Sequence, residues 1–170
     1  MTSGADTLFK IAVLPDSGEQ DQQLTDLLLD VYVGGGFTER ASAENAFRVE
    51  AVRKRGEIFV AKSDGELLGT AVLVRSGNEL RQIAKAGEAE IHLVAVKSSA
   101  RRKGVAEALL HACEKRALEL GVNSLVLSTQ ASMVAAQSLY EKLGFKRNPE
   151  RDWSRDNNRS YMAYEKKLVD

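Results

Sequence analysis

The densest chemical signal in the sequence is a basic turn, Arg101-Arg102-Lys103-Gly104, between an apolar run and an amphipathic segment. The apolar run, 88–96, predicts a buried strand, and the segment that begins at Gly104 predicts a helix. The first turn of a helix leaves backbone N–H groups without intrahelical acceptors, and its dipole favours negative charge. Basic side chains there are unfavourable for the helix alone, so an anionic ligand explains them better than a solvated turn does. The turn therefore predicts an anion site, with a pyrophosphate as the expected occupant.

Two side chains on the preceding strand and one on a later helix have the chemistry of proton transfer. Glu90 and His92 lie two residues apart, so a regular strand presents them on one face. The imidazole of His92, with an intrinsic pKa of about 6.5, suits a general base. Tyr140, a phenol with an ordinary pKa of about 10, can donate a proton. Each residue also has a purely structural interpretation, as a hydrogen-bonded strand residue or a core aromatic.

The other histidine and the single cysteine are expected to be structural. His111 falls on the polar face of the helix that follows the basic turn, and Cys113 falls on its apolar face. We therefore expect a solvated imidazole and a packed thiol that is not a nucleophile.

The strands and helices that would position these residues follow from hydrophobic periodicity. Short β-prone runs predict strands at 8–14, 57–62, 67–74, 88–96, 124–129, 145–147 and 160–168. Apolar residues at helical spacing predict helices at about 24–33, 41–55, 104–120 and 133–143. The second and third strands flank an Asp-Gly turn and should form a hairpin. Strand 88–96, its helix and strand 124–129 should form a right-handed β-α-β unit with parallel strands.

Three segments lack periodicity and are expected to be loops: Gly34–Arg40, Arg75–Gly87 and Asn148–Arg159. The glycine run at 34–36 does not match a P-loop, because it follows a helix and lacks the lysine and hydroxyl that such a loop needs. Gly56 is expected to cap the helix 41–55 at its C-terminus.

Composition indicates one ordinary globular domain of 170 residues, long enough to bury a sizeable core. The formal net charge is zero, which argues against nucleic acid as a partner. A single cysteine excludes an internal disulfide and fits a cytoplasmic location. Residues 1–6 are expected to be disordered and do not look like a signal peptide, and no apolar stretch is long enough to predict a membrane partner.

Beyond these local patterns, the chain resembles the GNAT acetyltransferases, which use acetyl-CoA or another acyl-CoA. Arg101-Arg102-Lys103-Gly104-Val105-Ala106 matches the pyrophosphate-loop pattern of that family: Arg or Gln, two residues, Gly, one residue, then Gly or Ala. Leu93-Val94-Ala95-Val96 matches its central strand, and Ala136–Phe145 matches its late helix almost residue for residue. The resemblance covers nearly the whole chain and is strongest over 89–145.

The resemblance implies a single α/β (α+β) domain over residues 1–170, built on a central mixed sheet of six to seven strands with about four helices. Its central strands should splay apart. It implies acetyl-CoA, or another acyl-CoA, as co-substrate without a metal, and a protein that is a monomer or a homodimer. The residues implied in cofactor binding are Val94, Ala95, Val96, Arg101, Arg102, Lys103, Gly104, Val105 and Ala106.

Within this set, the amides of 102–106 would bind the pyrophosphate, and the basic side chains would reach the 3′-phosphate of the adenosine. The strand 94–96 would pair with the pantetheine amides, and an N–H near Val94 would stabilise the oxyanion. One position departs from the family: Met133 stands where many relatives carry an asparagine near the cofactor. The chain therefore lacks an asparagine side chain that could bind the pantetheine arm, and the implied cofactor class is unchanged.

The catalytic residues implied are Tyr140, as the acid that protonates the departing thiolate, and Glu90, as a base acting through water; His92 is the alternative base. The expected reaction is direct acetyl transfer to a primary amine of a small molecule or protein in a ternary complex. A non-catalytic acyl-CoA-binding module of the same fold is the alternative. A nucleotide-phosphate-binding protein is a weaker one, since no Walker motif is present. The three unpatterned segments, with Trp153 and Tyr161, are expected to shape the acceptor site.

Overall fold

The computed structural model describes residues 8–155 and 159–170, so the expectation for residues 1–6 lies outside the described residues. The helices are α1 (Asp21–Tyr32), α2 (Arg40–Ala46), α3 (Val49–Arg53), α4 (Val105–Glu119) and α5 (Val134–Lys142), with 3-10 turns η1 (Ser98–Ala100) and η2 (Pro149–Arg151). The strands are β1 (Lys10–Val13), β2 (Glu57–Ser63), β3 (Glu66–Arg75), β4 (Glu88–Val96), β5 (Ser124–Gln130), β6 (Lys146–Arg147), β7 (Trp153–Ser154) and β8 (Ser160–Lys167).

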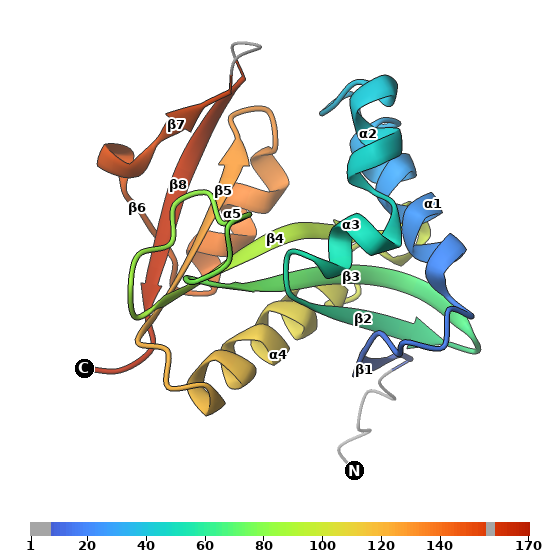
Figure 1. Ribbon diagram of the computed structural model, residues 1–170, viewed down its shortest axis with the longest axis horizontal. Helices are drawn as coiled ribbons and strands as arrows, with labels where there is room; N and C mark the ends of the chain where they lie inside the picture. Colours follow the sequence, from blue (N-terminus) through green and yellow to red (C-terminus); the bar gives the residue numbers. More distant parts are fainter. Residues whose placement is uncertain (1–7, 156–158) are drawn as a thin grey trace.

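These strands form one mixed sheet in the order β1-β2-β3-β4-β5-β8-β6, with β7 pairing β8 (Figure 1). The β4–β5 pair is parallel and its neighbours are antiparallel, as the β-α-β unit and the hairpin predict. The predicted α/β fold is confirmed. The described residues supply eight strands instead of six to seven, because the short strand β7 lies inside the segment expected to be a loop.

The sheet opens between its two central strands. β4 and β5 pair only from Glu88 to Ile91 on one strand and from Ser124 to Leu127 on the other. Beyond that point they run apart, β4 toward β3 and β5 along β8 (Figure 1). Leu93 has a left-handed φ of 52°, and one extra β4 residue stands between the pairs Thr70–Ala95 and Val72–His92. A β-bulge of this kind bends its strand, so the predicted splay has a local cause at Leu93.

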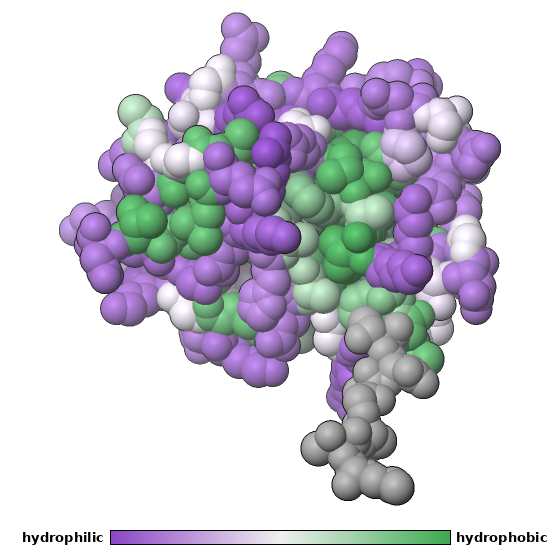
Figure 2. All heavy atoms as spheres, turned by 90° about the horizontal axis from the view of Figure 1, so that it is seen from below, coloured by the Kyte–Doolittle hydropathy of each residue, from purple (hydrophilic) through white to green (hydrophobic). Residues whose placement is uncertain are grey.

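Two apolar cores lie on opposite faces of the sheet. α4 and α5 cover one face, where Leu109 and Cys113 pack with Phe59 and Ala71. α1, α2 and α3 cover the other, over a second buried cluster (Figure 1). Successive residues of β2 alternate between the two cores, as the period of a strand requires. The outer side of the α4 face is largely hydrophilic, with hydrophobic atoms exposed in separate areas (Figure 2).

The helix predicted at 41–55 is wrong as a single element, because the structure divides it into α2 and α3. Arg48 is extended, with ψ 138°, and the Thr25 hydroxyl donates to the Phe47 carbonyl at 3.0 Å. Phe47 and Val49 are both buried. Residues two apart point to nearly opposite sides of a continuous helix, so only a break allows both to reach the same core.

The predicted role of Gly56 is also wrong. Its backbone is not left-handed, as a glycine cap would be. A Cβ on Gly56 would instead lie 1.9 Å from the carbonyl oxygen of Leu73. Glycine is required here because the backbone passes directly against β3.

Candidate active site

The basic turn lies between the end of β4 and the start of α4. The first hydrogen bond of α4 runs from Ala108 N to Gly104 O, so the preceding amides of the helix have no intrahelical acceptor. Arg101, Arg102 and Lys103 are exposed, and no ion pair links them to a carboxylate in the described part of the chain. Backbone donors and unneutralised positive charge are therefore concentrated at one point, as an anion site requires.

The backbone of the turn is held in an unusual conformation. Arg102 has a φ of 62° and Gly104, the residue that begins the helix, a φ of 78°. A Cβ built on Gly104 meets no atom within 4 Å, so the protein itself leaves this side of the turn open. Glycine thus serves the left-handed backbone and keeps a concave surface free for a ligand.

The strand segment Val94–Val96 borders the opening between β4 and β5. Ala95 and Val96 keep their antiparallel pairs with Thr70 and Gly69 of β3. On the β5 side, no described strand pairs with β4 beyond Ile91. This free edge leads directly into the basic turn, so an extended ligand could add to the sheet and end at the α4 amides.

Tyr140 lies on α5 and is only 5% exposed. Its ring packs against those of Phe145 and Tyr164, with 6.0 Å between centroids in each case. No described residue forms a hydrogen bond with its hydroxyl. Burial, followed by the nearby Tyr164, raises the pKa of Tyr140 well above its usual value, so the phenol keeps its proton at neutral pH.

Tyr32, on α1, joins this region, and the sequence interpretation treated it only as an apolar helix residue. Its hydroxyl donates to the Val94 carbonyl at 3.1 Å, next to the bulge. Burial raises the pKa of Tyr32, and the neighbouring Tyr140 raises it further. The hydroxyl of Tyr32 therefore lies at the opening, beside the strand segment Val94–Val96. A tyrosine at helical spacing gives no sequence signal for such a role, because the same pattern fits a core residue.

Glu90 and His92 share one face of β4, as predicted, and form a buried pair. The Nε2 of His92 lies 2.5 Å from Oε2 of Glu90, which is fully buried. Nδ1 of His92 lies 3.3 Å from Nη1 of Arg55. Because arginine can only donate, Nδ1 must accept, and the proton of the neutral ring sits on Nε2 and is donated to Glu90.

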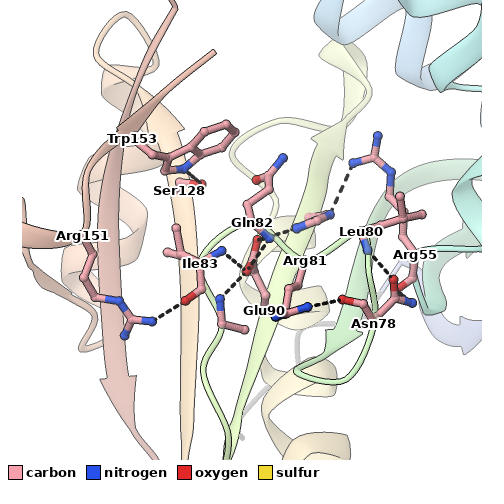
Figure 3. A network of polar contacts seen from close by, with 12 residues as sticks. Arg55, Asn78, Leu80, Arg81, Gln82, Ile83, Glu90, Ser128, Arg151 and Trp153 are labelled. Atoms are coloured by element: carbon pink, nitrogen blue, oxygen red, sulfur yellow. Dashed lines mark hydrogen bonds and ion pairs between the residues drawn. The ribbon is translucent and has the colours of Figure 1, made fainter. Parts of the chain in front are cut away.

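The Glu90 carboxylate also holds the loop that precedes β4 (Figure 3). Its Oε1 accepts from the backbone amides of Ile83 and Ala84 at 2.8 Å, and both oxygens accept from that of Gln82 at 3.1 Å. Burial raises the pKa of Glu90, but the hydrogen bonds from His92 and from these amides lower it more, so the net shift is downward. With its oxygens occupied and no exposed surface, Glu90 can act on a ligand only through His92 or the loop.

A second carboxylate anchors the same loop. Glu88 accepts from the amide of Lys85 at 2.8 Å and is bound by both terminal nitrogens of Arg151, at 2.7 and 2.9 Å. Arg151 also donates to the Ile83 carbonyl at 2.6 Å. The segment expected to be an unpatterned loop is therefore folded tightly over the start of β4.

An open cleft of about 820 Å³ lies beside this loop. Its lining comes from α2 and α3, the loop 79–82, and the segment that carries Trp153 and Arg155. Arg55 stands on one side of Glu90 and Trp153 on the other (Figure 3). Two of the three segments expected to shape an acceptor site therefore meet here. The third, Gly34–Arg40, contacts the end of β5, where Gln130 Nε2 donates to the Phe37 carbonyl at 2.9 Å.

Trp153 and Tyr161 stack at 4.3 Å with 11° between their planes, and Trp153 Nε1 donates to Ser128 Oγ at 3.1 Å. Trp153 lines the cleft, with Tyr161 stacked against it. Met133 begins α5 without capping it, and its sulfur accepts from the Thr129 hydroxyl at 3.2 Å. These placements bring the predicted aromatic residues to the cleft and turn Met133 toward β5.

His111 is exposed and Cys113 is fully buried, as predicted. Burial raises the pKa of the Cys113 thiol to about 12, so it is not a nucleophile at neutral pH.

Within residues 8–155 and 159–170, no cluster of three His, Cys, Asp or Glu residues is arranged to hold a metal ion. None of the helices in those residues combines the length and apolar character needed to cross a membrane.

A mixed sheet that opens beside a basic, glycine-containing turn defines an acyltransferase-like fold. Residues 22–145 match the model of the family described as the acetyltransferase (GNAT) family. The chain belongs to this family, which confirms the resemblance drawn from the basic turn and the late helix.

Two curated relatives match part of the chain. The N-acetyltransferase YvbK of Bacillus subtilis is 31% identical over 98 residues, 58% of each protein. The N-acetylaspartate synthetase of Xenopus tropicalis is 34% identical over 96 residues, 56% of this chain and 33% of that protein. The matched region thus spans less than two thirds of either relative. A Bacillus subtilis acetyltransferase solved in complex with CoA has the same fold, with a TM-score of 0.68, 22% identity and 95% and 99% of the two chains covered.

Proposed function

We propose that this protein is an acetyl-CoA-dependent N-acetyltransferase that transfers the acetyl group directly to a primary amine. The observation that carries the proposal is the free edge of β4, which runs past Val94–Val96 into the open amides at Gly104. That edge matches an extended pantetheine arm and its end matches a pyrophosphate. The CoA complex of a structural relative with the same fold supports the same ligand class.

In this proposal the amides of 102–106 hold the pyrophosphate, and Arg101, Arg102 and Lys103 add charge for the phosphates. Val94, Ala95 and Val96 bind the pantetheine amides through their backbone. An N–H near Val94 stabilises the developing oxyanion, at the bulge that turns the backbone toward the opening. The Tyr32 hydroxyl holds the Val94 carbonyl in place.

Acetyl-CoA supplies an activated thioester: the amine nitrogen forms a C–N bond as the C–S bond breaks, leaving an acetamide and the thiol of CoA. The ammonium loses two protons in total, one before the nitrogen attacks and one as the amide forms; the sulfur takes one proton as it leaves, and the other is released to solvent. Tyr140 donates to the sulfur, since its hydroxyl stays protonated and forms no hydrogen bond with any described residue.

His92 takes the proton from the acceptor. Its Nε2–H is fixed on Glu90, so Nδ1 carries the lone pair; this lone pair accepts from Arg55 in the free protein and takes a proton only when Arg55 turns to the acceptor. The Glu90 carboxylate stabilises the imidazolium that forms, as a buried carboxylate does for a catalytic histidine. Glu90 is therefore proposed as the residue that positions and charges the base, in place of the water-mediated base expected from the sequence.

The test is calorimetric binding of acetyl-CoA together with thiol release in the presence of a panel of amines. Gly104→Glu places a carboxylate at the phosphates and should weaken binding by more than about 100-fold, through repulsion and the loss of the open turn. Unchanged binding would remove the cofactor assignment. Binding without thiol release from any amine would favour the non-catalytic module.

Gly121→Glu is the matched control, because Gly121 follows the other end of α4. Its φ of 75° is close to the 78° of Gly104, and a Cβ there also meets no atom within 4 Å. Both variants should lose about 1–2 kcal/mol of stability from the left-handed backbone. Only the Gly104 variant should lose acetyl-CoA.

A further inference from the structure

The cleft beside the loop 79–82 has an excess of positive charge. Three arginines line it, Arg55, Arg81 and Arg155, and Glu79 is the one carboxylate among the lining residues. Arg81 donates to the carbonyl of its own loop, at Asn78 O, 3.1 Å away. Arg155 lies 5.3 Å from the ring centre of Trp153. Neither contact neutralises a guanidinium.

Arg55 is the most enclosed of the three. The only hydrogen bond of its guanidinium within the described residues is the 3.3 Å contact with His92, which leaves most of the guanidinium N–H donors without an acceptor. Burial lowers the pKa of Arg55, and the nearby Arg155 lowers it further. Tyr32 and Glu90 raise this pKa but do not cancel the two lowering effects, so the charge of Arg55 is only partly compensated in the free protein.

Several arginines outside the cleft form ion pairs with carboxylates. Arg53, Arg116 and Arg151 each lie within 3.0 Å of a carboxylate oxygen. None of the three cleft arginines forms an ion pair with a carboxylate in the ranges that the structure describes. Three arginines without a described carboxylate partner thus line one cleft, and among them Arg55 is half-buried, unlike the exposed Arg101 and Arg102 of the basic turn.

The cleft is also preorganised. Asn78 donates to the carbonyls of Lys54 and Arg55 at 2.8 and 3.0 Å and accepts from the amide of Leu80 at 2.8 Å. One side chain therefore ties the backbone of Arg55 to the loop that carries Arg81 (Figure 3). A ligand meets guanidinium groups that are already in position, which reduces the ordering that binding requires.

We propose that these arginines form a subsite for an anionic group of the acceptor, so that the substrate is a small primary amine that also carries a carboxylate or a phosphate. Guanidinium groups bind both anions through paired, charge-assisted hydrogen bonds. An anion on Arg55 places the rest of the acceptor next to His92, the proposed base. The inference rests on the proposed acetyl transfer, and it disfavours polycationic acceptors such as polyamines and aminoglycosides.

The test compares amines that differ only in the anion. β-Alanine is paired with β-alaninamide and O-phosphoethanolamine with ethanolamine, and spermidine and kanamycin represent polycations. Thiol release should give a kcat/KM at least about tenfold higher for the anionic member of one pair, the value expected for a charge-assisted contact. The pair that responds distinguishes carboxylate from phosphate. Equal or better turnover of the neutral amines or polycations would overturn the subsite and leave the acetyl transfer standing.

Arg55→Gln should reduce that anionic preference by roughly 10- to 100-fold, while acetyl-CoA affinity stays within about twofold. Arg155→Gln, at an exposed position, gives a second variant should Arg55→Gln fold poorly. Arg40→Gln is the control, since Arg40 pairs with Glu44 on α2 and does not line the cleft. An unchanged preference in both cleft variants would overturn the assignment.

A binding titration separates the two proposals. Calorimetry with β-alanine and with O-phosphoethanolamine, without acetyl-CoA, measures the subsite directly. Failure of acetyl-CoA to bind would reject the proposed transferase, whereas failure of both anionic amines to bind better than their neutral partners would reject the subsite alone.

Discussion

The two halves of the proposed site, one for the cofactor (the cofactor half) and one for the acceptor (the acceptor half), are built by different means. The cofactor half uses backbone groups of one continuous stretch, from the free edge of β4 through the basic turn to α4. The acceptor half uses side chains from α3, the loop 79–82 and the segment after η2, far apart in sequence. A backbone site depends on local conformation, whereas a side-chain site depends on how the whole chain folds.

The two halves meet at β4. Its edge faces the opening, while Glu90 and His92 project from the same strand toward the loop and Arg55. Removal of a single side chain should therefore affect the acceptor half strongly and the cofactor half weakly, whereas a side chain added at Gly104 should block the cofactor half. The following experiments test that contrast.

His92→Gln should give the largest effect, a loss of about 10²- to 10⁴-fold in kcat, as expected for removal of a general base. Acetyl-CoA affinity should not change, since His92 makes its contacts with Glu90 and Arg55. Steady-state kinetics and calorimetry on the same samples measure the two quantities. A variant that keeps its kcat would remove His92 from catalysis.

Tyr140→Phe should lower kcat by roughly 10²-fold, near the lower limit for a general acid, because a free CoA thiolate can leave slowly without help. Tyr164→Phe is the matched control: its ring packs on Tyr140 and is equally enclosed. Rates measured with acetyl-CoA in excess should separate the two variants. Equal rates would show that Tyr140 is a core aromatic residue and not the general acid.

Lowering the pH should destabilise the loop of the acceptor half before it destabilises α4. The pKa of Glu90 is lower in the folded protein than its ordinary value of 4.5, and that of Glu88, held by Arg151, is lowered too. Their contribution to the free energy of unfolding is therefore complete above about pH 4.5 and disappears as the pH falls through the lower folded-state pKa. Hydrogen exchange of amides 82–85, corrected for intrinsic rates, should rise on acidification before that of α4.

Glu90→Gln checks the origin of this effect. It keeps the shape but places an amide where three backbone donors now point, at a cost of about 1–3 kcal/mol. The variant should lose most of the acid dependence of exchange at 82–85. An unchanged dependence would assign the effect to Glu88 or to other carboxylates.

Arg102→Gln should have the smallest effect, about a two- to fivefold weaker binding of acetyl-CoA. Its side chain is exposed, and an exposed charge near a helix start contributes only about 0.3–1 kcal/mol. A loss of acetyl-CoA affinity as large as that of Gly104→Glu would show that basic side chains, and not backbone amides, contribute most of the binding in the cofactor half.

Much of the fold was predictable because its signals are local. β4 has the predicted bounds, the Asp64-Gly65 turn closes the predicted hairpin, and Gly121 ends α4 in the left-handed conformation. The failures arose where tertiary contacts override local preference. Burial of both Phe47 and Val49 divides one predicted helix into two. The short strand β7 exists only because β8 lies beside it.

The candidate site divides in the same way. Glycine at 104, basic residues before it and an apolar strand are visible as residue types in order, so the sequence predicts an anion site and suggests the family. The sharing of a face by Glu90 and His92 follows from the period of a strand. Nothing local indicates that Tyr32 binds the Val94 carbonyl or that Asn78 holds the end of α3.

By itself, the sequence predicted most of the order of elements, the basic turn before α4 and the class of ligand proposed for that turn, because these depend on neighbours along the chain. Only the tertiary structure decided that Glu90 is enclosed by the loop 82–84, that His92 faces Arg55, and that three arginines share one cleft. The reason is physical: contacts between side chains distant in sequence depend on packing of the whole chain, and hydrophobic periodicity carries no record of them.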